Sequence, residues 1–137
     1  MPLDLDLDHA PESATRARRA VRVYVEEEWP ESLDDAILRD LVDDIELVTA
    51  ELIANSVRHG ATPVSLHVAT AADDGCRSVT LVARDGGEWD ETDSDPDGGR
   101  GLLLVRALSA RLDVERGGLG TTVRVRLERP WPPGRPR

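Results

Sequence analysis

The amino-acid sequence predicts a two-layer α/β sandwich, in which helices cover one face of a mixed, mostly antiparallel sheet. The 137 residues fit one domain and are enough to bury a core without disulfides or a structural metal. Segments with strand alternation come in adjacent pairs joined by short turns, which favours antiparallel pairing. Segments with helical spacing separate these pairs, and helices in such a chain pack on one face of the sheet.

The first part of the chain predicts one strand followed by helices. Leu3, Leu5 and Leu7 alternate with aspartates, which is typical of a strand with one apolar face. Apolar residues at helical spacing predict a helix over residues 14–29, and Pro30 ends it. Ser32 is a candidate N-cap for a short second helix.

The strongest helix signal covers residues 45–57, where apolar side chains recur at three- and four-residue steps. Gly60 stands where a C-terminal cap glycine belongs. Two strands are then expected at residues 64–69 and 78–83, with residues 71–75 as the turn between them.

Between residues 85 and 99 the apolar pattern stops, and glycines, prolines and acidic residues predict a mobile loop. A further helix is expected to begin at Gly101 and to continue through Leu108. Two last strands, at residues 112–115 and 121–127, are joined by a glycine-rich turn. We therefore expect one domain over residues 1–128, followed by a disordered Pro- and Arg-rich tail over residues 129–137.

The charge of the chain limits its partners. There are 27 acidic against 17 basic residues, giving a formal net charge of −10, so free nucleic acid is not expected to bind. The acidic start lacks the basic and then apolar order of a signal peptide. No apolar run approaches the roughly 20 residues that a membrane span needs. We expect a cytoplasmic protein that does not contact a membrane.

Glu51 and Asn55 are one turn apart on one face of the predicted third helix. An amide oxygen is a suitable Mg²⁺ ligand, and a carboxylate can accept a proton from water or a hydroxyl. Spacing alone favours the alternative, a solvated polar pair on an amphipathic helix.

Three glycine-containing segments add weaker signals. Asp85-Gly86-Gly87 follows a strand, where an aspartate can accept a hydrogen bond from an adenine amino group, although Asp-Gly is also common in plain turns. The segment Gly98-Gly99-Arg100-Gly101 precedes a predicted helix, so its amides and the helix dipole suit an anion. The hydroxyl of Thr121 follows a tight glycine turn and is a candidate hydrogen-bond partner of a base.

Taken in order, these segments resemble the motifs of the GHKL (Bergerat-fold) ATPases. Residues 51–60, ELIANSVRHG, look like the N box, and Asp85-Gly86-Gly87 looks like the first glycine box. Residues 99–105, GRGLLLV, look like the second glycine box, and residues 118–121, GLGT, look like the third. Within this superfamily the chain is most similar to the bacterial anti-sigma-factor serine/threonine kinases, which belong to the histidine kinase-like ATPases. The resemblance extends from about Leu3 to Glu128.

The resemblance implies a Bergerat sandwich with a lid over Mg-ATP and a role for each motif residue. Asn55 would hold Mg²⁺, and Glu51 would be the general base. Asp85 would bind the adenine amino group, with Gly87 close to the ring and Thr121 near the adenine. Gly99, Arg100 and Gly101 would lie at the phosphates. Arg58 is basic and also near a motif, but no firm role follows for it.

Two functions follow from the resemblance. The first is a protein kinase that transfers the γ-phosphate of ATP to a serine of an anti-anti-sigma-type partner. The second is a non-catalytic ATP-binding module that sequesters a sigma factor or another regulator. The intact Glu51 favours the kinase, whereas the acidic predicted lid, which contains no Lys or Arg between Asp85 and Gly99, favours the module. A homodimer is compatible with both.

Overall fold

The computed structural model describes residues 1–59, 61–73, 75–87, 96–118 and 120–132. For His59 and for residues 96–101 it describes the backbone and not the side chains. The predicted C-terminal cap Gly60 and residues 88–95 of the predicted lid therefore lie outside the described residues.

Five strands form one sheet in the order β1-β2-β3-β5-β4, and all four neighbouring pairs are antiparallel. The strands are β1 (Leu3–Leu7), β2 (Val64–Asp73), β3 (Cys76–Asp85), β4 (Arg111–Gly117) and β5 (Gly120–Pro130). The antiparallel sandwich is thus confirmed, and most strands are longer than their apolar cores predict. Residues 71–73, predicted as part of a turn, pair instead with residues 76–78, because Gly75 at φ +83° allows a tighter reversal.

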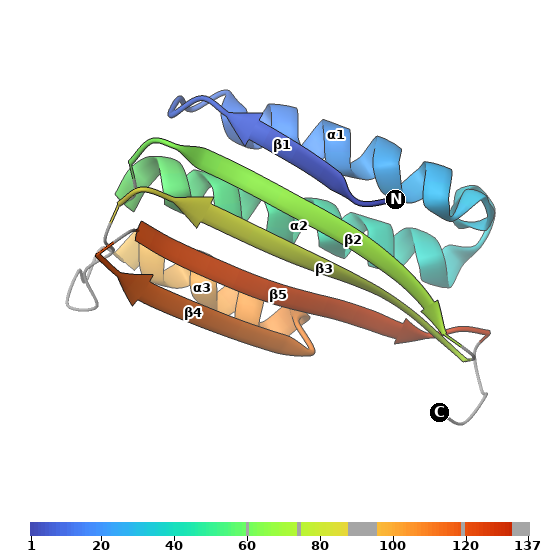
Figure 1. The fold of residues 1–137 in the computed structure, drawn as a ribbon. Helices are drawn as coiled ribbons and strands as arrows, with labels where there is room; N and C mark the ends of the chain where they lie inside the picture. Colours follow the sequence, from blue (N-terminus) through green and yellow to red (C-terminus); the bar gives the residue numbers. More distant parts are fainter. Residues whose placement is uncertain (60, 74, 88–95, 119, 133–137) are drawn as a thin grey trace.

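The helices α1 (Ser13–Glu28), α2 (Ala36–His59) and α3 (Pro96–Leu108) all lie on one face of this sheet, as Figure 1 shows. Alternate residues of the strands point toward these helices and form the core with them. The largest side chains that are completely buried in this core are Leu38, Leu41, Ile45, Leu52, Ile53, Leu66, Leu81 and Leu127. None of the described helices is long and apolar enough to cross a membrane.

The second and third predicted helices are one continuous helix, α2, of 24 residues. Ser32 does not cap it, because Ser32 lies inside a short 3-10 helix, η1 (Pro30–Leu33). The cap is Asp35, whose Oδ1 accepts a hydrogen bond from the backbone amide of Leu38 at 2.9 Å. Ser and Asp are both good N-cap residues, so the sequence alone could not choose between them.

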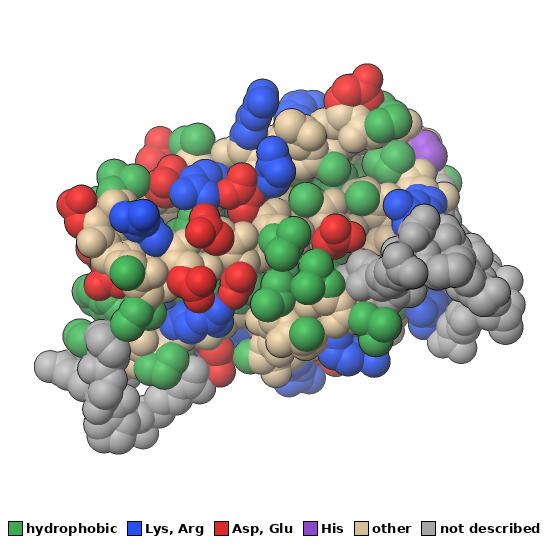
Figure 2. All heavy atoms as spheres, turned by 180° about the vertical axis from the view of Figure 1, so that it is seen from behind, with side chains coloured by type: hydrophobic (Ala, Val, Ile, Leu, Met, Phe, Trp, Pro, Cys, Tyr) green, Lys and Arg blue, Asp and Glu red, His purple; other side chains and the backbone are tan. Residues whose placement is uncertain are grey.

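Ion pairs connect the outer surfaces of α1 and α2. The guanidinium of Arg22 contacts Asp43 at 3.1 Å and also Glu46, which holds the pKa of Arg22 above its usual value. Arg18 lies 3.3 Å from Glu46 on the same surface. Figure 2 shows acidic and basic side chains interleaved on the helix face of the molecule. Ion pairs therefore connect α1 to α2 across this surface.

The fold continues past Glu128, the predicted end of the domain. Arg129 and Pro130 belong to β5, and the backbone amide of Trp131 donates to the carbonyl of Gly75 at 3.0 Å. The indole Nε1 of Trp131 donates to Asp35 Oδ2 at 3.1 Å, and Arg77 lies over the indole ring. The first residues of the predicted tail are thus ordered by contacts that are distant in sequence, whereas residues 133–137 lie outside the described residues.

Candidate functional site

Four chain segments meet at one end of the sandwich, where strands of the sheet end or begin. Figure 1 shows that β3 and α2 end here, and that β5 and α3 begin here. Antiparallel pairing of β3 with β5 brings the end of one strand beside the start of the other. The four motifs found in the sequence are therefore placed together by the fold, although they span about half of the chain.

Asp85 is the last residue of β3, and Thr121 lies opposite it on β5. Both side chains are buried on the helix side of the sheet. The backbone amide of Gly87 donates to Asp85 Oδ1 at 2.8 Å, and the Thr121 hydroxyl donates to the carbonyl of Gly87 at 3.0 Å. These bonds fix the chain just after β3, so the Asp85 carboxylate is held in one position at the end of this strand.

Two glycines make this close approach of backbones possible. A Cβ atom on Gly86 would lie 2.3 Å from the carbonyl oxygen of Thr62, and the Gly86 amide bonds to Ala61 at 2.7 Å. A Cβ atom on Gly120 would lie 2.0 Å from the carbonyl oxygen of Asp85, and Gly120 has φ +125°. The sequence indicated Gly87 as the glycine of close approach to a ligand, and that role stays a prediction. It missed Ala61 and Thr62, because no local pattern reports a contact over 24 residues.

Asn55 lies on α2, which packs against β3, β5 and α3. Its side chain is only 2% exposed, and its Nδ2 has no hydrogen-bond partner among the described residues. Buried polar atoms are almost always hydrogen-bonded, so this amide is available to a bound group. Glu51 precedes it by one helical turn and is half-buried. The predicted pair is thus placed on a helix that borders the site, and it is not a fully solvated surface pair.

The predicted phosphate segment differs from the expectation in one respect. Helix α3 begins at Pro96, so Gly99, Arg100 and Gly101 lie inside the helix and do not precede it. Proline is favoured at the first helical position because its missing amide hydrogen costs nothing there. The amide groups without partners inside the helix belong to its first four residues, which include Gly99 but exclude Gly101. Binding of an anion by the helix start stays a prediction for Gly99, and the Arg100 side chain is outside the described part.

Arg58 follows Asn55 on α2 and lines a cavity of about 220 Å³ together with Pro11, Ala54 and Val57. This cavity lies between the start of α1 and the last turns of α2. The structure therefore puts Arg58 on a surface shared with the N-terminal segment.

Comparison with known proteins agrees with this arrangement. The family profile of the histidine kinase-like ATPase domain matches residues 7–127. Among solved structures, the RsbU and RsbW domains of Rv1364c from Mycobacterium tuberculosis superpose with a TM-score of 0.70 at 26% identity. That match covers 95% of this chain and 33% of the other, so the chain spans about one third of its neighbour's length.

A second structure, the histidine kinase domain of the Erythrobacter litoralis EL346 blue-light activated histidine kinase, has a TM-score of 0.47 at 25% identity. It covers 64% of this chain and 44% of the other. A search of curated proteins finds no significant match. The family profile covers most of the chain, and the fold and the order of the motifs agree with it: the chain belongs to the family of histidine kinase-like ATPase domains.

Proposed function

We propose that this domain binds Mg-ATP at the edge where β3, β5, α2 and α3 meet, and that it transfers the γ-phosphate to a serine of a protein partner. The observation that carries the proposal is the buried Asn55 amide, whose Nδ2 has no partner among the described residues. It lies one turn from the half-buried Glu51, on a helix that packs against β3 and β5. Membership of the ATPase family and the similarity to a structure that contains an RsbW domain support it.

The adenine end of the site consists of Asp85, Gly87 and Thr121. Asp85 already accepts one hydrogen bond from Gly87, and a carboxylate has acceptor capacity for several more. It is therefore suited to accept from an amino group on a flat base. GTP carries a carbonyl where adenine carries that amino group, so two acceptors would face each other. The arrangement favours ATP over GTP.

The phosphate end is expected between α2 and the start of α3. The side-chain amide of Asn55 supplies one oxygen, and amide oxygens are ordinary Mg²⁺ ligands, whereas its Nδ2 is a donor suited to a phosphate oxygen. The donor set thus fits a Mg²⁺ ion held by one protein oxygen together with phosphate oxygens and water. When bound, the ion would neutralise charge on the phosphates. The first-turn amides of α3 would stabilise the same anion, because a helix N-terminus carries partial positive charge.

Glu51 supplies the acid–base chemistry in this proposal. Its carboxylate accepts the proton of the serine hydroxyl while the serine oxygen attacks the γ-phosphorus. The bond from this phosphorus to the bridging oxygen breaks, and ADP leaves. Positioning and electrostatic stabilisation provide most of the rate in such transfers, so a single half-buried carboxylate is sufficient chemistry.

The alternative is a binding module of the same fold that holds ATP and sequesters a sigma factor or another regulator without phosphorylating it. The net charge of −10 and the absence of lysine favour it, because all 17 basic residues are arginines and no lysine can approach the γ-phosphate. Both functions share the nucleotide site and differ only in whether Glu51 acts.

Calorimetry with ATP, ADP and GTP, each with and without Mg²⁺, tests the shared part of the proposal. We expect ATP and ADP to bind in a Mg²⁺-dependent way and GTP to bind more weakly. Ligand binding should also raise the melting temperature, since only the folded state contains the site. Neither heat nor a thermal shift at millimolar Mg-ATP would contradict both functions at once.

A further inference from the structure

None of the described helices covers the face of the sheet that points away from α1, α2 and α3, as Figure 1 shows. Odd-numbered residues of β3 and β5, such as Leu81 and Val125, are buried toward the helices. Even-numbered residues of these strands therefore lie on the uncovered face. Val82 is one of them, and yet it is only 5% exposed. The longer side chains around it must cover it, as the alkyl stems of arginines commonly do.

Arg84 and Arg124 lie on this face and are both exposed. Arg84 is opposite Thr122, and Arg124 is two residues further along β5, opposite Val82. The two arginines are thus diagonal neighbours across the central strand pair, about 7 Å apart. Within the described residues neither has an ion-pair partner. Their alkyl stems can cover Val82, while both guanidinium groups remain exposed on this face.

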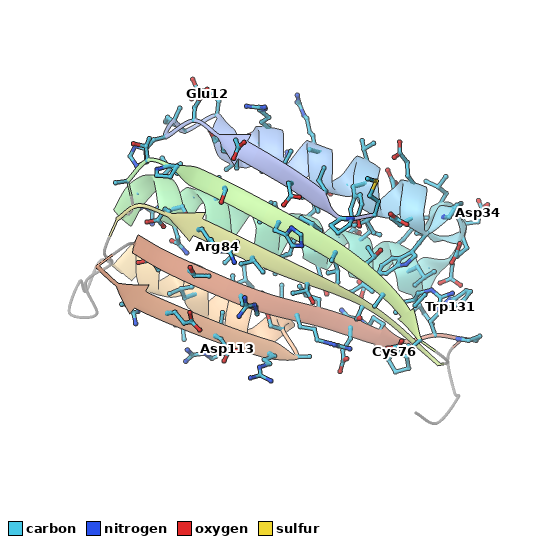
Figure 3. The ribbon with its side chains drawn as sticks, viewed as in Figure 1. Glu12, Asp34, Cys76, Arg84, Asp113 and Trp131 are labelled. Atoms are coloured by element: carbon cyan, nitrogen blue, oxygen red, sulfur yellow. The ribbon has the colours of Figure 1, made fainter. Side chains whose placement is uncertain are left out.

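Two other arginines of the same face, Arg111 and Arg126, make ion pairs. Arg126 Nε lies 3.3 Å from Glu128, and Arg111 Nε lies 2.8 Å from Asp113. Asp113 is directly opposite Arg124 in the register of β4 and β5, but its carboxylate is bonded to Arg111. Figure 3 shows Arg84 and Asp113 on the uncovered side of the ribbon. Arg84 and Arg124 are therefore the two arginines of this face that make no ion pair within the described residues.

On the same face, acidic residues flank the two arginines on the edge strands β1 and β4. Asp4 and Asp6 are exposed on β1, and Asp113 and Glu115 occupy the same face of β4. A long polyanion crossing the strands would meet these carboxylates. An anionic ligand is therefore confined to a strip that runs along β3 and β5. A short acidic peptide fits this strip better than a nucleic-acid backbone does.

We propose that Arg84 and Arg124 form a docking strip for an acidic segment of a partner protein, bound in an extended conformation parallel to β3 and β5. In an extended chain, side chains two residues apart lie on one side at a spacing of about 6.6 Å. Arg84 and Arg124 are offset by two residues along the strand direction, so carboxylates at alternate positions of a peptide that runs between them reach one guanidinium each. Guanidinium–carboxylate contacts are charge-assisted and can be bidentate. Thr122, which is partly exposed, lies beside both arginines on the same face. The strip is on the opposite face from Asp85 and Thr121 and does not depend on nucleotide binding.

The test uses the full chain and fluorescein-labelled peptides of roughly ten residues, about the length of β3. One peptide alternates Glu with Thr and the other alternates Gln with Thr. Fluorescence anisotropy at low salt should show at least about tenfold tighter binding of the Glu peptide. The variant Arg84→Gln/Arg124→Gln should lose this preference. The matched control Arg39→Gln/Arg106→Gln, which removes the same charge from exposed positions on α2 and α3, should keep it.

A charge reversal provides a second readout. Arg84→Glu/Arg124→Glu should bind a peptide that alternates Arg with Thr, which the wild-type chain should not bind, and circular dichroism checks that each variant is folded. Equal binding of the Glu and Gln peptides, or equal losses in both Gln double variants, would overturn the proposal. So would tighter binding of a single-stranded oligonucleotide of the same charge. Sedimentation that reveals a dimer dissociated by Arg84→Gln/Arg124→Gln would assign the strip to a second copy of the chain instead.

Discussion

Asp85 and Thr121 lie directly opposite each other on β3 and β5, with exposed fractions of 5% and 1%. The backbone of Gly87 connects them, since its amide donates to the aspartate and its carbonyl accepts from the threonine. Two weak motifs that are far apart in sequence thus form one rigid element. This element is the basis of the first prediction.

Asp85→Asn should weaken ATP binding by about 1–3 kcal/mol and reduce the preference over GTP, because an amide nitrogen would face the adenine amino group. Its amide oxygen can still accept from Gly87, so the loop should keep its conformation. Calorimetry measures the affinities, with Asp113→Asn on β4 as a control that should bind ATP normally. ATP affinity that is unchanged in a folded Asp85→Asn protein would remove Asp85 from the site.

Variants of Glu51 and Asn55 should distinguish effects on phosphate transfer from effects on Mg-ATP binding. Glu51→Gln should keep Mg-ATP affinity and lower phosphate transfer by about a hundredfold to ten-thousandfold, because a general base acts mainly in the transition state. Asn55→Ala should lose both, because a missing Mg²⁺ ligand also weakens metal-dependent binding. The measurements are calorimetry and transfer of radiolabelled phosphate to candidate anti-anti-sigma proteins. Absence of transfer by the wild-type chain to its true partner would favour the binding module, and a fully active Glu51→Gln would assign the base to another residue.

Gly120→Ala should destabilise the fold by roughly 1–3 kcal/mol, because φ +125° and the carbonyl of Asp85 at 2.0 Å both exclude a Cβ atom. Gly117→Ala is the matched control at the other end of the same turn, since a Cβ atom there would meet nothing within 4 Å. It should be neutral or slightly stabilising. Urea unfolding measures both variants. Equal stability of the two would show that the turn can relax without cost.

Asp35 should contribute to the pH dependence of the free energy of unfolding. The bond from the Leu38 amide and then the bond from the Trp131 indole lower the pKa of Asp35. A carboxyl with a lowered pKa stabilises the folded state fully above its unfolded pKa of about 4, and this stabilisation disappears as the pH falls through the folded value. Trp131→Phe removes the indole bond, so its unfolding midpoint should depend less steeply on pH below about 4 than that of the wild type. Identical pH profiles from urea unfolding at pH 2.5–5 would exclude a contribution from Trp131.

Truncation should locate the end of the folded domain. A chain that ends at Pro132 should melt like the full chain. A chain that ends at Glu128 should melt at a lower temperature, because it loses the Trp131–Asp35 bond and the contacts of Arg129 with Asp40 and Asp44 on α2. Differential scanning calorimetry measures both. Equal melting temperatures of the two truncated chains would show that the folded domain ends at residue 128.

The sequence by itself determined the fold class and the presence of the four motifs. Alternation in Leu3–Leu7 and the helical spacing of residues 45–57 reflect burial of one face, and burial is a local property of each element. The position of Asn55 and Glu51 one turn apart also followed from the helix period alone. The net charge of −10 limited the partners without any structure.

Only the tertiary structure decided how these elements meet. Pairing of β3 with β5 places Asp85 beside Thr121, and the carbonyls of Thr62 and Asp85 require glycine at positions 86 and 120. The choice of Asp35 over Ser32 as the cap, the start of α3 at Pro96 and the anchoring of Trp131 were equally hidden in the sequence. The physical reason is common to all of them: contacts between residues distant along the chain depend on how elements pack, and local propensity and spacing carry no information about that packing.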